Sequence, residues 1–376
     1  MKKILVTGGA GFIGSFIVDK LIEDGESEVY IFDNLDPQVH PNGEKPDYLN
    51  KDAVFIEGDV RDKDALAKAV EGIEQVYHMA AAVGVGQSMY QITKYVQVNT
   101  TGTANLLDVI INGNNKVEKL LVAASMSSYG EGRYNCPEHG IVNPPLRPES
   151  QMAAGDWELH CPHCDEIMEP LPTDENKPQI CNSIYALTKK DQEEMALMWG
   201  QAYRIPAVAL RFFNVYGPRQ SLSNPYTGVC AIFMSRIKND KPPVIYEDGQ
   251  QTRDFIAVED IARASIMAMN DPRTDYGVFN VGGGNPTTIE NIALTLAQIY
   301  SKEITPQITR AFRKGDVRHC IASISKIRNA VGFQPRISFS EGMKALAAWT
   351  ETASAEDKFD TAANELENRG LIVKRS

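Results

Sequence analysis

A tyrosine and a lysine stand four residues apart in the segment YALTK at 185–189. In a helix, residues at this spacing lie on one face, so the ammonium can approach the phenol. A nearby positive charge favours the phenolate and lowers the pKa of Tyr185, which would make it a general base. The same spacing recurs at Tyr90 and Lys94. Position favours Tyr185, because it opens the helix that follows the fifth predicted strand, whereas Tyr90 precedes that strand.

Hydroxyl side chains stand at the end of that strand, in the segment ASMSSYG at 124–130. In open α/β sheets, ligands bind beyond the carboxyl ends of the strands. A serine at this edge could hydrogen-bond the substrate oxygen that the tyrosine deprotonates. The segment therefore predicts a hydroxyl partner for the tyrosine base.

A glycine-rich turn, TGGAGFIG at 7–14, contains Gly8, Gly11 and Gly14. Glycine lets the backbone turn tightly and approach a pyrophosphate that sits at the helix N-terminus. The alternative is a tight turn without a ligand, but a position between a strand and a helix is the context that a dinucleotide site requires. Asp33, at the end of the second strand, would accept hydrogen bonds from the adenine ribose and repel a 2′-phosphate. NAD is therefore favoured over NADP.

A further acidic position, Asp59-Val60, follows the third predicted strand. It could contact the adenine of the cofactor. Asp59 could equally cap the helix predicted at 63–70, and both interpretations remain open.

Short apolar runs alternate with helical patterns through the first half of the chain. This alternation predicts a doubly wound parallel sheet of the Rossmann type, an α/β fold. The runs are Ile4 to Thr7, Val29 to Asp33, Val54 to Glu57, Val76 to Met79 and Lys119 to Ala124, and the helical patterns are Phe12 to Ile22, Ala65 to Val70, Tyr95 to Ile111 and Tyr185 to Tyr203.

A proline-rich stretch interrupts this alternation before the tyrosine helix and contains four of the six cysteines. We read residues 131–182 as an insertion in an NAD-binding domain at 1–215. A smaller, mixed substrate-binding domain is expected at 216–350, from which parts near 244–262 could return to the first domain. The charged segment 351–376 is expected to be a surface helix or tail without functional content.

The charge and the apolar segments of the chain indicate which classes of partner it does not bind. The 376 residues include 38 Lys and Arg against 49 Asp and Glu, for a net charge of −11. This balance argues against nucleic-acid binding, which relies on a basic surface. No apolar segment is long enough for a membrane span or an export signal, so we expect a cytoplasmic protein that does not bind membranes.

The cysteines of the insertion indicate a metal. Cys161 and Cys164 form a CxxC pair, and Cys136 and Cys181 flank it. Four thiolates suit a closed, tetrahedral structural zinc site. Unligated thiols or a redox pair are the alternatives. One of three nearby histidines could replace a thiolate, namely His139, His160 or His163.

Together these motifs resemble the extended short-chain dehydrogenase/reductase family, which comprises NAD-dependent nucleotide-sugar epimerases and dehydratases. The likeness spans most of residues 1–350 and includes HMAA at 78, RFFNVYGPRQ at 211, RDF at 253, NVGGG at 281 and RKGDVRH at 313. It implies a nucleotide-diphosphate sugar as substrate and a homodimer formed through helices near 92–112 and 186–203.

The resemblance also assigns site residues. It implies Ser125, Tyr185 and Lys189 as the catalytic residues. Cofactor contacts are expected from Gly8, Gly11, Phe12, Ile13, Gly14, Asp33, Asn34, Asp59, Val60, Ala80, Ala81, Asn99, Tyr185 and Lys189, and substrate contacts from Ser88, Ser127, Asn214, Arg253 and Arg318.

The residues after Ser125 bear on the reaction. Dehydratases of the family carry an Asp-Glu pair there, where this chain has Met126 and Ser127. Neither side chain exchanges a proton in that role, which favours a 4-epimerase, an isomerase that works through a transient 4-keto sugar with tightly bound NAD. Members with a cysteine-rich insertion are the most similar, which implies dTDP-L-rhamnose or a UDP-sugar as substrate. The alternatives are a dehydratase, a reductase or a non-catalytic NAD-binding protein.

Overall fold

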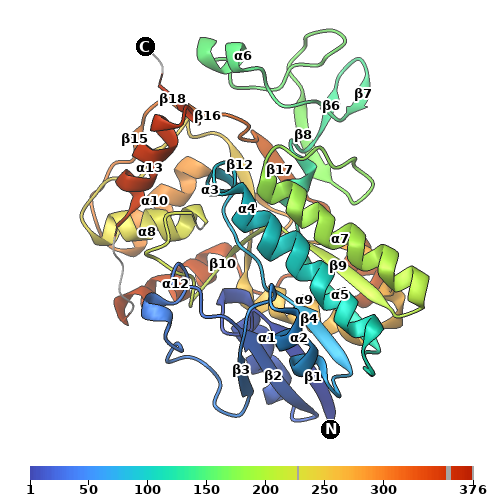
Figure 1. The fold of residues 1–376 in the computed structure, drawn as a ribbon. Helices are drawn as coiled ribbons and strands as arrows, with labels where there is room; N and C mark the ends of the chain where they lie inside the picture. The colour runs from blue at the N-terminus through green and yellow to red at the C-terminus, as the bar shows by residue number, and fades with distance from the viewer. Residues whose placement is uncertain (227, 353–356, 375–376) are drawn as a thin grey trace.

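The computed structural model describes residues 1–226, 228–352 and 357–374, and its centre is a parallel sheet (Figure 1). Within these residues seven strands pair in the order β13-β9-β5-β4-β1-β2-β3. The order reverses between β1 and β4, which creates the crevice where doubly wound sheets bind ligands. The strands are β1 (Lys2–Thr7), β2 (Ser27–Asp33), β3 (Val54–Glu57), β4 (Gln75–His78), β5 (Lys119–Ser125), β9 (Ala207–Phe212) and β13 (Val278–Val281). The predicted fold class is confirmed.

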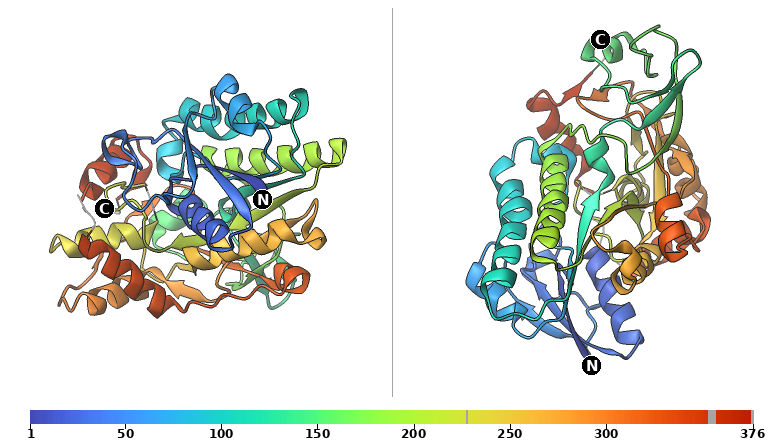
Figure 2. Two further views of the ribbon diagram at one scale, coloured as in Figure 1. Left: turned by 90° about the horizontal axis from the view of Figure 1, so that it is seen from below. Right: turned by 90° about the vertical axis from the view of Figure 1, so that its right-hand side faces the viewer.

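Helices cover both faces of this sheet (Figure 2). Alternate residues of β5 show the two layers, because Leu121 and Ala123 enter one core while Leu120, Val122 and Ala124 enter the other. A strand with both faces buried is therefore a continuous apolar run, as predicted. The first core is covered by α1 (Phe12–Glu23) and α9 (Val258–Asn270), and the second by α2 (Lys63–Val70), α5 (Gly102–Asn112) and α7 (Ile184–Tyr203).

A second sheet joins the insertion to the C-terminal part of the chain. Three strands of the insertion, β6, β7 and β8, continue the sheet formed by β10, β12 and β17. Its strands are β6 (Arg133–Cys136), β7 (Gly140–Val142), β8 (Glu169–Thr173), β10 (Asn214–Tyr216), β12 (Thr252–Ala257) and β17 (His319–Ala322), with β14 (Pro286–Thr288) paired to β12.

The C-terminal part also contains its own helical core and two small ribbons. The core packs α8 (Val229–Lys238), α10 (Ile289–Ile299) and α12 (Phe339–Thr352) together. The ribbons pair β11 (Val244–Ile245) with β15 (Gln307–Ile308), and β16 (Phe312–Arg313) with β18 (Ile372–Val373). The remaining helices are α3 (Val85–Ser88), α4 (Ile92–Tyr95), α6 (Glu149–Ala154), α11 (Ser325–Val331) and α13 (Phe359–Asn368).

Two segments differ from the sequence-based expectation. The helix predicted over Tyr95 to Ile111 is divided, because a π-helical turn, η2 (Val96–Thr101), separates α4 from α5. Parts of the chain near 244–262 were expected to return to the NAD-binding domain. The segments beyond 215 that pack with it are α9 and β13, whereas β12 belongs to the second sheet. Among the described residues, no helix combines the length and apolarity needed to cross a membrane.

Candidate active site

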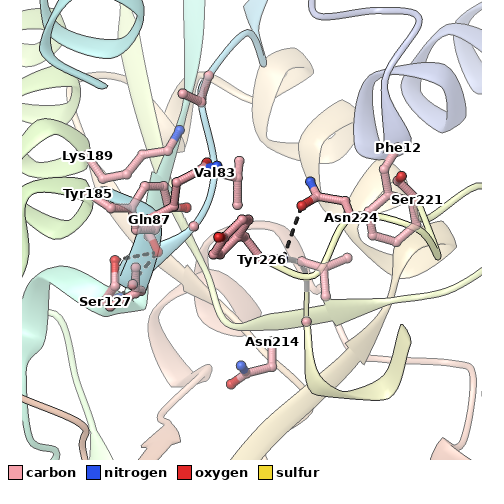
Figure 3. A pocket seen from close by; sticks show the side chains of 18 of the residues that line it. Phe12, Val83, Gln87, Ser127, Tyr185, Lys189, Asn214, Ser221, Asn224 and Tyr226 are labelled. Atoms are coloured by element: carbon pink, nitrogen blue, oxygen red, sulfur yellow. Dashed lines mark hydrogen bonds between the residues drawn. The ribbon is translucent and has the colours of Figure 1, made fainter. Parts of the chain in front are cut away.

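A cavity of about 640 Å³ lies between the carboxyl edge of the parallel sheet and the C-terminal part of the chain. Its lining runs from Gly8 in the first glycine turn, past Ser125 and Tyr185, to Arg253 on β12. In Figure 3, Tyr185 and Lys189 lie side by side on α7 with Ser127 close to them, and Phe12 stands across the cavity. The cavity therefore joins the predicted cofactor turn to the predicted catalytic residues.

Local hydrogen bonds fix Tyr185 at the start of α7. Ser183 caps this helix, since its hydroxyl accepts a hydrogen bond from Ala186 N at 3.1 Å. The Ser88 hydroxyl accepts one from Tyr185 N at 3.0 Å. Burial raises the pKa of Tyr185 to about 12, while its hydrogen bond with Ser125 lowers it. The predicted lowering by Lys189 is therefore not the dominant effect in this structure.

Lys189 is held one helical turn further along. Its Nζ donates a hydrogen bond to the carbonyl oxygen of Ala123 on β5 at 2.9 Å. Because the side chain is buried, the pKa of Lys189 is lowered to about 7. The ammonium thus has a fixed position against the end of β5.

Ser125 and Ser127 form a small hydroxyl pair at the end of β5. The Ser125 hydroxyl accepts hydrogen bonds from the Ser127 backbone N at 3.2 Å and from the Ser127 hydroxyl at 2.9 Å. Both residues line the cavity. Since Ser127 supplies the donors, the Ser125 hydroxyl hydrogen is directed to another acceptor.

The glycine turn has the shape of a dinucleotide cradle. A Cβ atom at Gly14 would lie 2.2 Å from the Gly8 carbonyl oxygen, and one at Gly8 would lie 2.7 Å from Ala80 N. Side chains are therefore excluded where a pyrophosphate must approach the backbone. Asp33 accepts hydrogen bonds from Ala10 N at 3.1 Å and Leu35 N at 2.9 Å, so its carboxylate is fixed at the cavity wall. These residues fit NAD.

Most of the predicted cofactor residues line this cavity, but two do not. Asp59 instead accepts a hydrogen bond from Asn34 Nδ2 at 2.8 Å and pairs with Arg61. Asn99 is fully buried and hydrogen-bonds both backbone groups of Ala82. Both therefore position other residues of the wall. Those that line it are Gly8, Gly11, Phe12, Ile13, Gly14, Asp33, Asn34, Val60, Ala80, Ala81, Tyr185 and Lys189.

Some of the predicted substrate residues line the cavity and others do not. Ser127, Asn214 and Arg253 line the cavity, whereas Ser88 and Arg318 do not. Ser88 is buried beneath Tyr185, as described above. A guanidinium nitrogen of Arg253 lies 2.9 Å from the Asp316 Oδ1 atom, so the two side chains form an ion pair.

Arg318 differs most from its predicted role. It is completely buried and pairs with Glu158 of the insertion, Glu247 at 3.0 Å and Asp248 at 2.7 Å. Arg147 of the insertion meets the same Glu247 at 2.9 Å. These buried pairs join the insertion to the C-terminal part, so Arg318 does not reach the cavity.

Besides Lys94, two cations that were not predicted as site residues line the cavity. Arg313 and Lys314 line the wall, and the Arg313 guanidinium lies 4.6 Å from the centre of the Tyr246 ring. Both belong to the RKGDVRH segment in which Arg318 was predicted. The signal was therefore present, but the motif contains three arginine or lysine residues and the pattern does not say which of them face the cavity.

The cysteine cluster also differs from the predicted set. Cys136, His139, Cys161 and Cys164 place their ligand atoms within 4.8 Å of one another. Cys181 lies apart, and its Sγ donates to the Ser128 carbonyl oxygen at 3.7 Å.

His139 joins the cluster because it follows β6 in the turn to β7. Its Nδ1 lies 3.5 Å from Cys136 Sγ and 3.6 Å from Cys161 Sγ. The two sulfurs of Cys136 and Cys164 are 3.5 Å apart. Three thiols and one imidazole are a donor set that suits tetrahedral zinc.

Comparison with known proteins shows which families and structures this chain resembles. Residues 4–155 match the model of the NAD dependent epimerase/dehydratase family, and residues 167–346 match that of GDP-mannose 4,6 dehydratase. A dTDP-L-rhamnose 4-epimerase from Burkholderia thailandensis is 36% identical over 351 residues, which cover 93% of this chain and 94% of that protein. This chain belongs to the NAD-dependent epimerase/dehydratase family. The expected family is thereby confirmed.

Other members are similar to this epimerase/dehydratase over nearly its whole length. A UDP-glucuronate 4-epimerase from Thermodesulfobacterium geofontis is 30% identical over 93% of this chain and 97% of that protein. The solved UDP-glucose 4-epimerase of Thermotoga maritima, with UDP-glucose, has a TM-score of 0.76 at 30% identity and covers 93% of this chain and 98% of its own. A UDP-glucuronic acid 4-epimerase from Bacillus cereus, solved with its substrate and NAD, gives 0.75 at 27% identity, with 93% and 99% covered.

Proposed function

We propose that this protein is a nucleotide-sugar 4-epimerase that uses NAD. The observation that carries the proposal is the cavity wall around Tyr185, which offers hydroxyls and an ammonium but no nearby carboxylate. Among the described lining residues the carboxylates are Asp33, Asp36 and Asp316. Asp33 belongs to the cofactor end, and Asp36 and Asp316 pair with Lys94 and Arg253.

A dehydratase needs a second acid or base to remove water, and this wall does not supply one. Epimerisation at C4 needs only one proton shuttle. Tyr185 removes the proton from the 4-hydroxyl oxygen and later returns it. The chemistry that bound NAD supplies is reversible hydride transfer at C4 of the sugar.

The other residues position the proton transfer. Ser125 hydrogen-bonds Tyr185 and is itself oriented by Ser127. The Lys189 ammonium, anchored on Ala123, stabilises negative charge that develops on the phenol. The three side chains thus form one acid-base unit at the end of β5.

The substrate is proposed to be a nucleoside diphosphate sugar, with dTDP-L-rhamnose and UDP-hexoses or UDP-uronic acids as the first choices. Arg253, Arg313 and Lys314 line the far side of the cavity and supply positive charge for a diphosphate. Turnover of a panel of these sugars, with the products identified by NMR, tests the proposal.

We also propose that Cys136, His139, Cys161 and Cys164 hold a structural zinc ion. Their donor set supports a closed site, which leaves no position for a reacting group. The cluster lies in the insertion, whose buried pairs with Glu247 and Arg318 dock it against the C-terminal part. Zinc would stabilise this module and take no part in the reaction.

Two further proposals concern the assembly and its location. Exposed apolar side chains gather on the helices expected at a dimer interface, among them Ile92 on α4 and Leu187 and Met198 on α7. They support a homodimer. Among the described residues no cysteine forms a disulfide, which supports a reducing, cytoplasmic location.

A further inference from the structure

The C-terminal segment 357–374, here called the C-terminal strap, forms part of the cavity wall. It consists of α13 and β18, and Figure 1 shows both in red beside α10 and β16. Phe359, Leu366 and Leu371 from this segment line the cavity. This segment was expected to be a surface helix or tail without functional content, yet it lies at the cavity.

Several contacts hold the strap to the C-terminal part of the chain. Arg236 on α8 pairs with Asp360 at 2.7 Å, and Lys241 pairs with Asp357 at 2.9 Å. The Arg236 guanidinium also lies 4.8 Å from the centre of the Phe359 ring. The first turn of α13 is thus fixed by charge and by packing.

The far end of the strap is fixed by a strand. β18 pairs antiparallel with β16, so that Ile372 faces Arg313 across the ribbon. Next to this pair, Lys314 N donates a hydrogen bond to the Leu371 carbonyl oxygen at 3.0 Å. The strap therefore lies directly beside the two cavity cations, Arg313 and Lys314.

The middle of the strap reaches the other side of the cavity. Glu365 accepts hydrogen bonds from Tyr90 and Tyr226, both at 3.0 Å. A Cβ atom at Gly86 would lie 3.2 Å from Leu366, which shows how closely α13 approaches α3. The strap thus bridges the two walls between which a substrate must lie.

We propose that the C-terminal strap is a substrate-binding element that contacts the nucleoside diphosphate part of the substrate. The inference rests on the proposed function, which supplies this ligand class. Arg313 and Lys314 attract the diphosphate, and the apolar side chains of Leu366 and Leu371 pack against the adjoining nucleoside. The strap lies apart from the glycine turn at Gly8 and Asp33, so NAD binding does not depend on it.

Two strap variants test this proposal in the full-length, NAD-loaded protein. Leu366→Ala on α13 and Leu371→Ala before β18 each remove an apolar contact, and we expect each to weaken the binding of dTDP and UDP about tenfold by calorimetry. Asn364→Ala is the matched control, because Asn364 is exposed on the same helix. It should bind as wild type does, and all variants should retain NAD.

A conservative variant separates contact from folding. Leu366→Met keeps the volume and should bind dTDP within about twofold of wild type. The proposal is overturned if the two alanine variants, folded and NAD-loaded, bind dTDP and UDP as wild type does, or if wild type binds neither nucleotide. Epimerase turnover by wild type is measured separately. If wild type turns over a sugar but the variants bind nucleotide unchanged, only the binding role of the C-terminal strap is refuted. Nucleotide binding without turnover of any sugar refutes the proposed function instead.

Discussion

Lys189 Nζ and the carbonyl oxygen of Ala123 lie 2.9 Å apart, and this hydrogen bond joins α7 to the end of β5. The bond fixes the ammonium where it can stabilise the Tyr185 phenolate. It gives the buried ammonium one hydrogen-bond acceptor, although burial still lowers the pKa of Lys189 to about 7.

Lys189→Met should therefore reduce turnover by about 100-fold, because it removes the charge that stabilises the phenolate. Lys190→Met is the matched control, since Lys190 is the next residue and pairs with Glu194 at 3.6 Å. Initial rates at saturating substrate measure the effect. Equal rates for the two variants would refute the role of Lys189.

The pKa of Tyr185 predicts the pH dependence of turnover. Burial raises this pKa to about 12 and the Ser125 hydrogen bond lowers it. Since the base is the phenolate, turnover should increase with pH on the acidic side of the profile. Ser125→Ala removes the lowering interaction, so the tyrosine pKa rises and this limb should move to higher pH. A profile of kcat that keeps its position in Ser125→Ala would contradict the assignment.

Arg318 and Arg313 should behave in opposite ways. Arg318→Met leaves Glu158, Glu247 and Asp248 without their shared partner and should cost about 3–5 kcal/mol of unfolding free energy. Arg313→Met should raise KM for the nucleotide sugar with little change in stability. Denaturant unfolding and steady-state kinetics on both variants measure the difference. A raised KM with normal stability in Arg318→Met would show that Arg318 contacts the substrate and does not stabilise the fold.

Metal content distinguishes the two possible ligand sets of the insertion. The purified protein should contain about one zinc ion per chain, and His139→Ala should lose it. Cys181→Ser is the control and should keep its zinc, because Cys181 bonds the Ser128 carbonyl oxygen instead. Elemental analysis of both variants for zinc decides between the two ligand sets. Loss of zinc from Cys181→Ser with retention in His139→Ala would restore the four-cysteine set.

Local patterns were sufficient to predict the parallel sheet, the glycine turn and the helix of Tyr185. The glycine turn and the helix depend on residues that are close in sequence, such as Gly8 and Gly14 or Tyr185 and Lys189, and each strand of the sheet is a continuous apolar run. His139 was considered only as a substitute ligand, because its place beside Cys161 depends on how the β6 to β7 turn folds back.

The cavity wall was harder to predict where it depends on distant segments. Arg313 and Arg318 belong to one motif, yet one faces the cavity and the other a buried carboxylate cluster supplied by Glu158 and Glu247. Leu366 belongs to an ordinary amphipathic helix, and only its packing against Gly86 places it on the wall. The motif at 313–319 marks its cations without showing which of them face the cavity, and the sequence around Leu366 has no motif at all.

The most direct test of the account is incubation of the purified, NAD-loaded protein with dTDP-L-rhamnose, UDP-glucose and UDP-glucuronate in deuterated water, followed by NMR and mass spectrometry. We expect one of these sugars to convert to its C4 isomer with unchanged mass, with hydrogen retained at C4 and with no net NADH. A product lighter by water or carbon dioxide, or stoichiometric formation of NADH, would contradict it. So would the absence of any isomer from the whole panel.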